Sequence, residues 1–296
     1  MLISLPYKEV IELKPMPKIL FSLSVALTSV LMGTTINVSQ TVQSQAISSE
    51  STDLPIIMYH HILEEESQLN DYTISPQEFR TDLEFLQEQG YTPIVVQDLI
   101  QYTQGGELPE KPIMLTFDDG YESFAVYAFP LLQEYHFPAV YAVIGTYADL
   151  YSQQDEHHVR YSHSNWETLK ALQESGLVEI QNHSYDLHSL QNGERGAQKR
   201  SNESAGSYQK RLWQDLDQLQ KDCRQHLDGW TPTCFAYPFG FSSPEALPVL
   251  QQLGFSAAMT CEEKINQLTG DPEELYHLKR FNRPHGKSVA EILAAA

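Results

Sequence analysis

The sequence is poor in cysteine and in positive charge, and each shortage excludes a class of protein. Cys223, Cys234 and Cys261 are too few and too scattered for a disulfide scaffold or a cysteine-rich zinc site. Two states of the cysteines remain possible: one disulfide bridge with one free thiol, or three buried thiols. Lysine and arginine number 19 against 39 acidic residues, a formal charge of -20. We therefore expect no nucleic acid as a partner, because a polyanion would be repelled.

A membrane-spanning run of full length is also missing near the N-terminus. The apolar run 19–32 follows two lysines and has about 14 residues, fewer than the roughly 20 of a spanning helix. With small residues at Ser44 and Ala46, this pattern resembles a secretory signal peptide, and an uncleaved anchor remains the alternative. We expect 1–46 to be a signal peptide or membrane anchor with a linker and 47–296 to be the functional domain. The protein would then be secreted, periplasmic or on the outer face of the membrane, with that anchor as its only membrane contact.

The remaining chain alternates short apolar strands with helices at the spacing of βαβ units. Ser75 predicts a helix start, because Pro76 follows it and Glu78 stands three residues later. No GxGxxG or P-loop is present, so a distorted (β/α) barrel of seven or eight units is favoured over a Rossmann sheet. We expect strands at 54–59, 91–96, 113–117, 139–144, 177–181, 233–237 and 255–260. We expect helices after Ser75 and Gln97, at 122–135, 165–175 and 208–227 and between the last two strands, and a surface loop at 190–208.

Two predicted strands run directly into polar residues that can carry chemistry. The stretch KPIMLTFDDGY (111–121) ends in Asp118 and Asp119, and the stretch EIQNHSYDLHSL (179–190) contains His183 and His188. The carboxyl ends of parallel strands face the ligand crevice of α/β proteins. One carboxylate and two imidazoles suit a divalent ion with open positions, either in a hydrolase or in a non-haem iron oxygenase. The second aspartate favours hydrolysis, because a carboxylate beside metal-bound water can take its proton.

Three motifs together resemble a known family. TFDDG (116–120), the HS...H pair at 183 and 188, and YPFG (237–240) are similar to the first three motifs of the NodB-type polysaccharide deacetylases, carbohydrate esterase family 4. The resemblance covers about 54–286, from LPIIMYHHI to LKRFNRPHG. The longer spacing between the two histidines resembles the poly-N-acetylglucosamine deacetylase subgroup. The resemblance implies a distorted (β/α)7–8 barrel of the NodB type.

The resemblance also implies a role for each matched residue. Asp118 becomes the catalytic base, and Asp119, His183 and His188 become the ligands of a divalent ion, with zinc as the first choice and cobalt or nickel as alternatives. The third motif implies oxyanion and substrate contacts at Tyr237, Phe239 and Gly240, in particular a backbone amide at the Phe239–Gly240 turn.

The sequence departs from the family pattern at the arginine that opens the third motif. Ala236 stands at that position, so the usual partner of the catalytic aspartate is missing, and Arg280 and Arg283 are the candidates to replace it.

The general acid of the family is the second departure. The late Leu-x-His motif is matched only by 275–277, and we expect His60 to be the acid, because the subgroup is permuted and a histidine can donate a proton at neutral pH. His61 would point to the opposite side of a continuing strand. The other histidines considered are His277 and His285 as weaker candidates for the acid, and His157, His158 and His163 as surface residues.

The sequence therefore predicts a metal-dependent hydrolase that removes N-acetyl groups from amino sugars in a polysaccharide. It would hydrolyse a carbon–nitrogen bond other than a peptide bond. Its partner would be an N-acetylated polysaccharide. An O-acetyl carbohydrate esterase and a non-catalytic carbohydrate-binding pseudoenzyme are the alternatives. Nothing in the sequence identifies the polysaccharide.

Overall fold

The computed structural model describes residues 51–296. The predicted signal peptide or anchor and the boundary after residue 46 therefore lie outside the described residues. Within 51–296, no helix is both long enough and apolar enough to cross a membrane.

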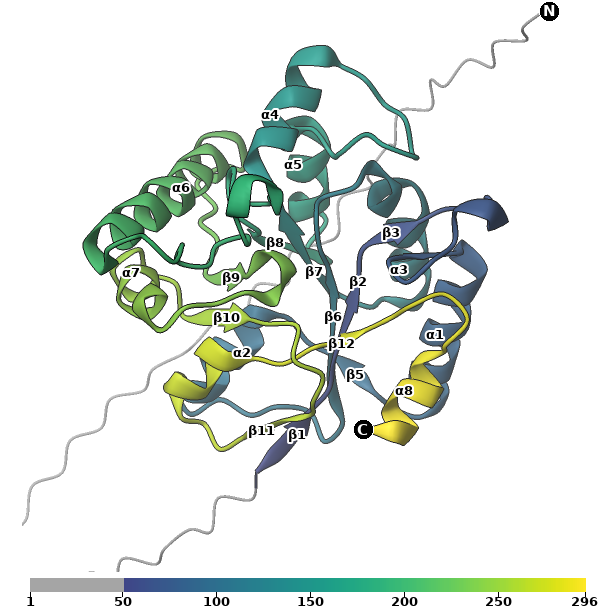
Figure 1. The fold of residues 1–296 in the computed structure, drawn as a ribbon. Coiled ribbons are helices and arrows are strands. Elements are labelled where there is room, and N and C mark those ends of the chain that lie inside the picture. The colour runs from purple at the N-terminus through teal and green to yellow at the C-terminus, as the bar shows by residue number, and fades with distance from the viewer. Residues whose placement is uncertain (1–50) are drawn as a thin grey trace, which may run out of the picture. The chain divides into compact units, whose positions relative to one another are not determined.

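A curled sheet of eight strands forms the centre of the fold (Figure 1). Its order is β10-β9-β8-β7-β6-β2-β12, with β5 also paired to β6, and every pair is parallel. Helices cover the outside of the curl, which confirms the predicted distorted (β/α) barrel. The strands are β2 (Ile56–Tyr59), β5 (Thr92–Pro93), β6 (Pro112–Phe117), β7 (Ala139–Val143), β8 (Val178–Asn182), β9 (Cys234–Ala236), β10 (Ala257–Met259) and β12 (Phe281–Asn282).

Strand β6 shows why this sheet is buried on both faces. All six of its residues are buried, as expected for a central parallel strand. Ile113, Leu115 and Phe117 belong to one apolar cluster and Met114 to another. Since side chains alternate across a strand, Thr116 and Asp118 share the face of Met114, inside the curl. The strand thus delivers Asp118 to the interior at its carboxyl end.

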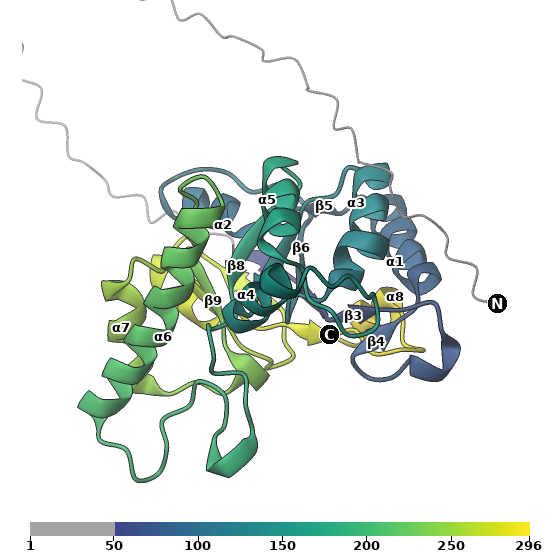
Figure 2. The ribbon, with the colours of Figure 1, turned by 90° about the horizontal axis from the view of Figure 1, so that it is seen from above.

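Within the described residues, eight α-helices pack around the sheet. Figure 2 shows their arrangement. The predicted cap of the first is confirmed, because Glu78 N donates to Ser75 Oγ at 3.2 Å and Ser75 N donates to Glu78 Oε2 at 2.8 Å. The helices are α1 (Pro76–Glu88), α2 (Val96–Thr103), α3 (Phe129–Tyr135), α4 (Gly145–Gln154), α5 (Trp166–Glu174), α6 (Ala205–His226), α7 (Leu247–Gln252) and α8 (Val289–Ala295).

Several boundaries differ from the sequence prediction. The strand predicted at 54–59 is divided at Pro55, which has no N–H for a sheet bond, into β1 (Thr52–Leu54) and β2. The helix predicted at 122–135 begins with a π-helical turn at Phe124–Ala128 before α3. Helices α4 and α8 were not predicted. Three further short strands were also not predicted, namely β3 (His61–Ile62), β4 (Thr73–Ile74) and β11 (Asn266–Leu268).

The cysteine alternatives are also decided. All three thiols are free, which excludes the alternative of one bridge. Cys223 and Cys234 are buried, whereas Cys261 is partly exposed.

Candidate active site

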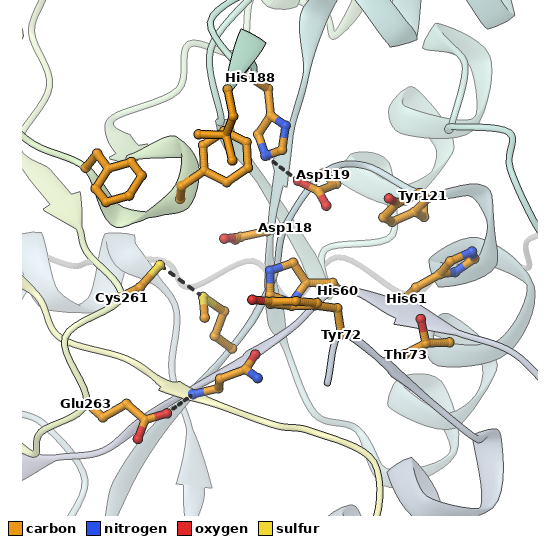
Figure 3. A pocket seen from close by; sticks show the side chains of 15 residues that line it. His60, His61, Tyr72, Thr73, Asp118, Asp119, Tyr121, His188, Cys261 and Glu263 are labelled. Atoms are coloured by element: carbon orange, nitrogen blue, oxygen red, sulfur yellow. Dashed lines mark hydrogen bonds and ion pairs between the residues drawn. The ribbon is translucent and has the colours of Figure 1, made fainter. Parts of the chain in front are cut away.

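A cavity of about 770 Å³ opens at the carboxyl ends of β2 and β6. It contains both aspartates of the first motif and His188 of the second (Figure 3). Its size is typical of a small-molecule or sugar site. The topology explains its position, because β2 and β6 are neighbours in the sheet and β12 lies beside β2.

Strained backbone marks the two motifs that line this cavity. Asp119 has a φ of 71° and Ser184 a φ of 81°, both in the left-handed region that non-glycine residues seldom occupy. Such conformations cost free energy and concentrate at functional sites. At Asp119 the chain turns sharply at the end of β6, so that Asp118 and Asp119 can both face the cavity.

Asp119, His183 and His188 form a cluster that fits a metal ion. One ligand atom from each lies within 4.8 Å of the others. Asp119 Oδ1 lies 3.4 Å from His183 Nε2 and 3.2 Å from His188 Nε2, and this buried oxygen has no hydrogen-bond partner in the described chain. A buried acceptor without a partner is costly unless something else fills its place. A carboxylate and two imidazoles are ligands suited to zinc and similar ions.

Neighbouring groups fix the orientation of the two histidine rings. His183 Nδ1 lies 2.8 Å from the Ala236 carbonyl oxygen, so Nδ1 carries the proton and the Nε2 lone pair faces Asp119. His188 packs on the Phe239 ring, with 4.2 Å between ring centroids.

The loop between these histidines is anchored by Asp215 of α6. Its two carboxylate oxygens accept hydrogen bonds from Tyr185 N and Asp186 N, each at 2.8 Å. Gly145 N and Thr146 N, at the start of α4, donate to the carbonyls of Ser184 and Tyr185 at 3.1 and 2.9 Å. Helices α4 and α6 therefore hold the loop between His183 and His188 in place.

Asp118 pairs with Arg280, which decides between the two candidate arginines. Arg280 Nη1 lies 2.7 Å from Asp118 Oδ1, and Nη2 lies 2.8 Å from Oδ2, in a fully buried bidentate pair. Arg283 instead binds Asp82 of α1, with 2.7 Å from Nε to Oδ2. Arg280 is therefore the partner of Asp118, for which position 236 offers only an alanine.

The ion pair keeps Asp118 charged. Burial raises the pKa of its carboxyl, but the Arg280 guanidinium and nearby histidines lower it by more, so the pKa lies below its ordinary value. Both oxygens retain a lone pair, since each accepts only one Arg280 hydrogen bond.

His60 and His61 have different surroundings. His60 lies between β2 and β3 on the cavity wall, its Nδ1 is buried without a hydrogen-bond partner in the described chain, and burial lowers its pKa more than Asp119 and Asp118 raise it. His61 Nε2 lies 3.1 Å from the Arg160 carbonyl oxygen and Nδ1 lies 2.7 Å from Ser123 Oγ. Both nitrogens of His61 are therefore occupied, whereas His60 is available.

The third motif places only one of its predicted contact residues in the cavity. Phe239 lines the cavity with a φ of 59°, whereas Tyr237 is buried against Phe235. Gly240 N donates to the Tyr237 carbonyl at 2.8 Å. A Cβ at Gly240 would lie 2.7 Å from Cys261 N, so only glycine fits this turn.

The remaining histidines lie outside the cavity lining. His277 is exposed, and His285 Nδ1 lies 3.0 Å from Glu78 Oε2. His157 and His158 are exposed as predicted. The prediction of His163 as a surface residue is wrong, because it is buried in a stack between Tyr121 and Tyr147 at centroid distances of 4.7 and 4.1 Å. The polar residues around it in sequence gave no sign of these aromatic partners.

A sequence profile of the family described as polysaccharide deacetylase matches residues 105–258, slightly more than half of the chain. This chain belongs to the polysaccharide deacetylase family. The matched segment contains Asp118, Asp119, both cluster histidines and Phe239. His60 and Arg280 lie outside it, on the two sides of the matched segment.

Curated relatives of this family member are poly-beta-1,6-N-acetyl-D-glucosamine N-deacetylases. That of Escherichia coli (strain K12) is 27% identical over 257 residues, which cover 79% of this chain and 38% of the relative. That of Staphylococcus aureus (strain N315) is 23% identical over 197 residues, 67% of this chain and 64% of the relative. The chain thus spans less than two thirds of the length of these relatives.

Solved structures of the family share the fold. IcaB from Ammonifex degensii is 27% identical with a TM-score of 0.67, over 82% of this chain and 96% of that one. The de-N-acetylase from Aggregatibacter actinomycetemcomitans has a TM-score of 0.72 at 24% identity, over 83% of this chain and all of that one.

Proposed function

We propose that this chain is a metal-dependent hydrolase that removes N-acetyl groups from the amino sugars of a polysaccharide. The carrying observation is the charged, arginine-bound Asp118 next to the Asp119, His183 and His188 cluster, at the end of a cavity of sugar size. The names of the curated relatives make poly-β-1,6-N-acetyl-D-glucosamine the first candidate substrate. The pattern at 1–46, which resembles a signal peptide, supports an activity outside the cytoplasm.

The cluster residues would hold the ion, and zinc is our first assignment. A divalent ion there lowers the pKa of bound water to about 7 and polarises a carbonyl oxygen. Asp118 takes a proton from the attacking water, and Arg280 keeps the Asp118 carboxylate oriented and ionised before that transfer. The products are acetate and a free sugar amine.

Two further groups complete the proposed mechanism. His60 donates a proton to the departing amine, and solvent then returns a proton to His60 and removes the one that Asp118 took from the attacking water. We assign the oxyanion contact to the backbone N–H of Phe239, since Gly240 N already donates to Tyr237.

The proposed bond type is tested by comparing acetylated polymers. Acetate release from poly-β-1,6-N-acetyl-D-glucosamine, with little from acetylated xylan, is the expected result for the full chain loaded with zinc. The reverse preference would identify an O-acetyl esterase.

Metal binding is expected to stabilise the folded chain through these ligands. Zinc at about 100 times its dissociation constant should add about 2.7 kcal/mol to the free energy of unfolding of chelated protein. Thermal unfolding with and without zinc measures this, and His188→Ala, at a partly exposed ligand, should abolish the shift. His285→Ala is the control, because His285 contacts Glu78 and not the cluster. An unchanged shift in His188→Ala would remove His188 from the ligand set.

The role of His60 predicts a loss of turnover that another histidine does not share. His60→Ala should lower kcat by about 100-fold or more, since a general acid contributes on that scale. His277→Ala should retain wild-type kcat, because His277 is exposed and outside the cavity lining. Steady-state acetate release measures both. Wild-type kcat in His60→Ala would assign the acid to another group.

A further inference from the structure

The cavity carries a carboxylate that no cation of the described chain balances. Glu263 is exposed to solvent and lies on the cavity wall, on the far side of Asp118 from Asp119 and His188, beyond Cys261 (Figure 3). Its Oε1 accepts one hydrogen bond, from Asn282 N at 3.3 Å. Within 51–296 it forms no ion pair, whereas its neighbour Glu262 lies 3.9 Å from Lys279 Nζ. No lysine or arginine of this part of the chain lines the cavity.

Asn282 adds a second unfilled acceptor on the same wall. Its Nδ2 donates to the Asp71 carbonyl at 2.8 Å, which fixes the direction of the amide. Its Oδ1 is buried and has no hydrogen-bond partner in the described chain. A buried acceptor left without a donor costs free energy. A ligand that supplies donors at this place would remove that cost.

Asn282 Oδ1 and the Glu263 carboxylate together favour a ligand that is both a hydrogen-bond donor and positively charged. A primary ammonium offers three N–H donors and a charge, so it can fill Asn282 Oδ1 and pair with the Glu263 carboxylate together. A sugar hydroxyl could satisfy Asn282, but it would bring no charge to attract the Glu263 carboxylate. The formal charge of -20 on the whole chain also attracts a cationic ligand.

We propose that Glu263 and Asn282 form an amine subsite, which binds the protonated amine of a glucosamine residue next to the N-acetylated residue undergoing hydrolysis. This inference rests on the proposed function, whose product is a sugar with a free amine. Because the subsite lies away from the metal cluster, it contacts a neighbouring sugar and not the reacting acetyl group. Each deacetylation therefore creates a better substrate, and the enzyme prefers partly deacetylated chains.

The preference can be measured with short substrates. The substrates are the β-1,6-linked N-acetylglucosamine tetramer and the two tetramers that carry one internal glucosamine. For the zinc-loaded full chain, the preference is the kcat/KM of acetate release from the better mixed tetramer divided by that from the fully acetylated one. Glu263→Gln should lower this ratio by about three- to tenfold, and the loss should shrink in high salt. Glu262→Gln is the matched control and should keep the wild-type ratio.

Two results would overturn the amine subsite. An unchanged ratio in Glu263→Gln would show that Glu263 does not sense the amine, and an equal loss on all tetramers would indicate hydroxyl binding or a general defect.

A binding measurement separates this inference from the proposed function. Calorimetry with the fully deacetylated glucosamine tetramer needs no turnover, and Glu263→Gln should weaken binding about three- to tenfold relative to Glu262→Gln. Wild-type protein that releases no acetate from any tetramer would contradict the proposed function, while weaker binding by Glu263→Gln would still support the subsite. Equal binding by both variants would reject the subsite whatever the activity.

Discussion

Asp118→Asn is expected to lower acetate release by about 100- to 10,000-fold while the chain still binds its metal. An amide cannot take a proton from the attacking water, so the proposed base is lost. The cluster of Asp119, His183 and His188 does not include Asp118, and therefore the ligands remain. Steady-state acetate release and metal content of the same purified sample measure the two effects.

The matched variant is Asp119→Asn, which should lose both metal and turnover. Loss of metal from Asp118→Asn would instead make Asp118 a ligand, and wild-type turnover in that variant would refute it as the base.

Arg280→Met should lower the free energy of unfolding by about 3–5 kcal/mol, because it leaves the buried carboxylate of Asp118 without a counter-charge. Asp118→Asn in the Arg280→Met background should recover much of this loss, since it removes the uncompensated charge. Chemical denaturation of the wild type, both single variants and the double variant measures the interaction free energy between Asp118 and Arg280. Additive destabilisation in the double variant would contradict a direct pair.

The pH dependence of this variant has a defined sign. In the wild type the folded pKa of Asp118 is below its unfolded value, so the pair stabilises the fold above the unfolded pKa, and this contribution is lost as the pH falls through the folded pKa. Without Arg280, the pKa of Asp118 rises, because burial raises it and the largest lowering contribution is lost. The destabilisation by Arg280→Met should therefore be largest at neutral pH and smaller in acid.

Local sequence patterns were enough to predict the chemical groups of the candidate site. Asp118 and Asp119 follow β6, and His183 and His188 follow β8. Both strands belong to one parallel sheet, with β7 between them, so their carboxyl ends lie at the same edge. The partner of Asp118 could only be narrowed to two arginines, because Arg280 is 162 residues away and no local pattern encodes such a contact.

Helix α4 and the burial of His163 could not be predicted for the same reason, because both depend on contacts between distant parts of the chain. Gly145–Gln154 has few apolar residues, and its N-cap, Ile144, makes no side-chain cap bond, so both usual signals of a helix are missing. Its start nevertheless holds the loop of the second motif, and its Tyr147 covers His163. These contacts are tertiary and leave no periodic signal in the sequence.

The sheet order explains how residues outside the matched family segment reach the site. Strand β2 pairs with β6, and β12 pairs with β2, so strands from near both ends of the described chain lie within two positions of the first motif's strand. His60 follows β2, and Arg280 precedes β12. The proposed acid and the partner of the proposed base therefore enter the site from opposite ends of the sequence.

The central claim is metal-dependent hydrolysis of N-acetyl groups, and acetate release tests it most directly. The full chain is treated with a chelator, dialysed, and assayed on poly-β-1,6-N-acetyl-D-glucosamine before and after zinc, cobalt or nickel is added. We expect no release from the chelated protein and restored release with at least one of these ions. Folded, metal-loaded protein that releases no acetate from this polymer with any of the three ions would contradict the account.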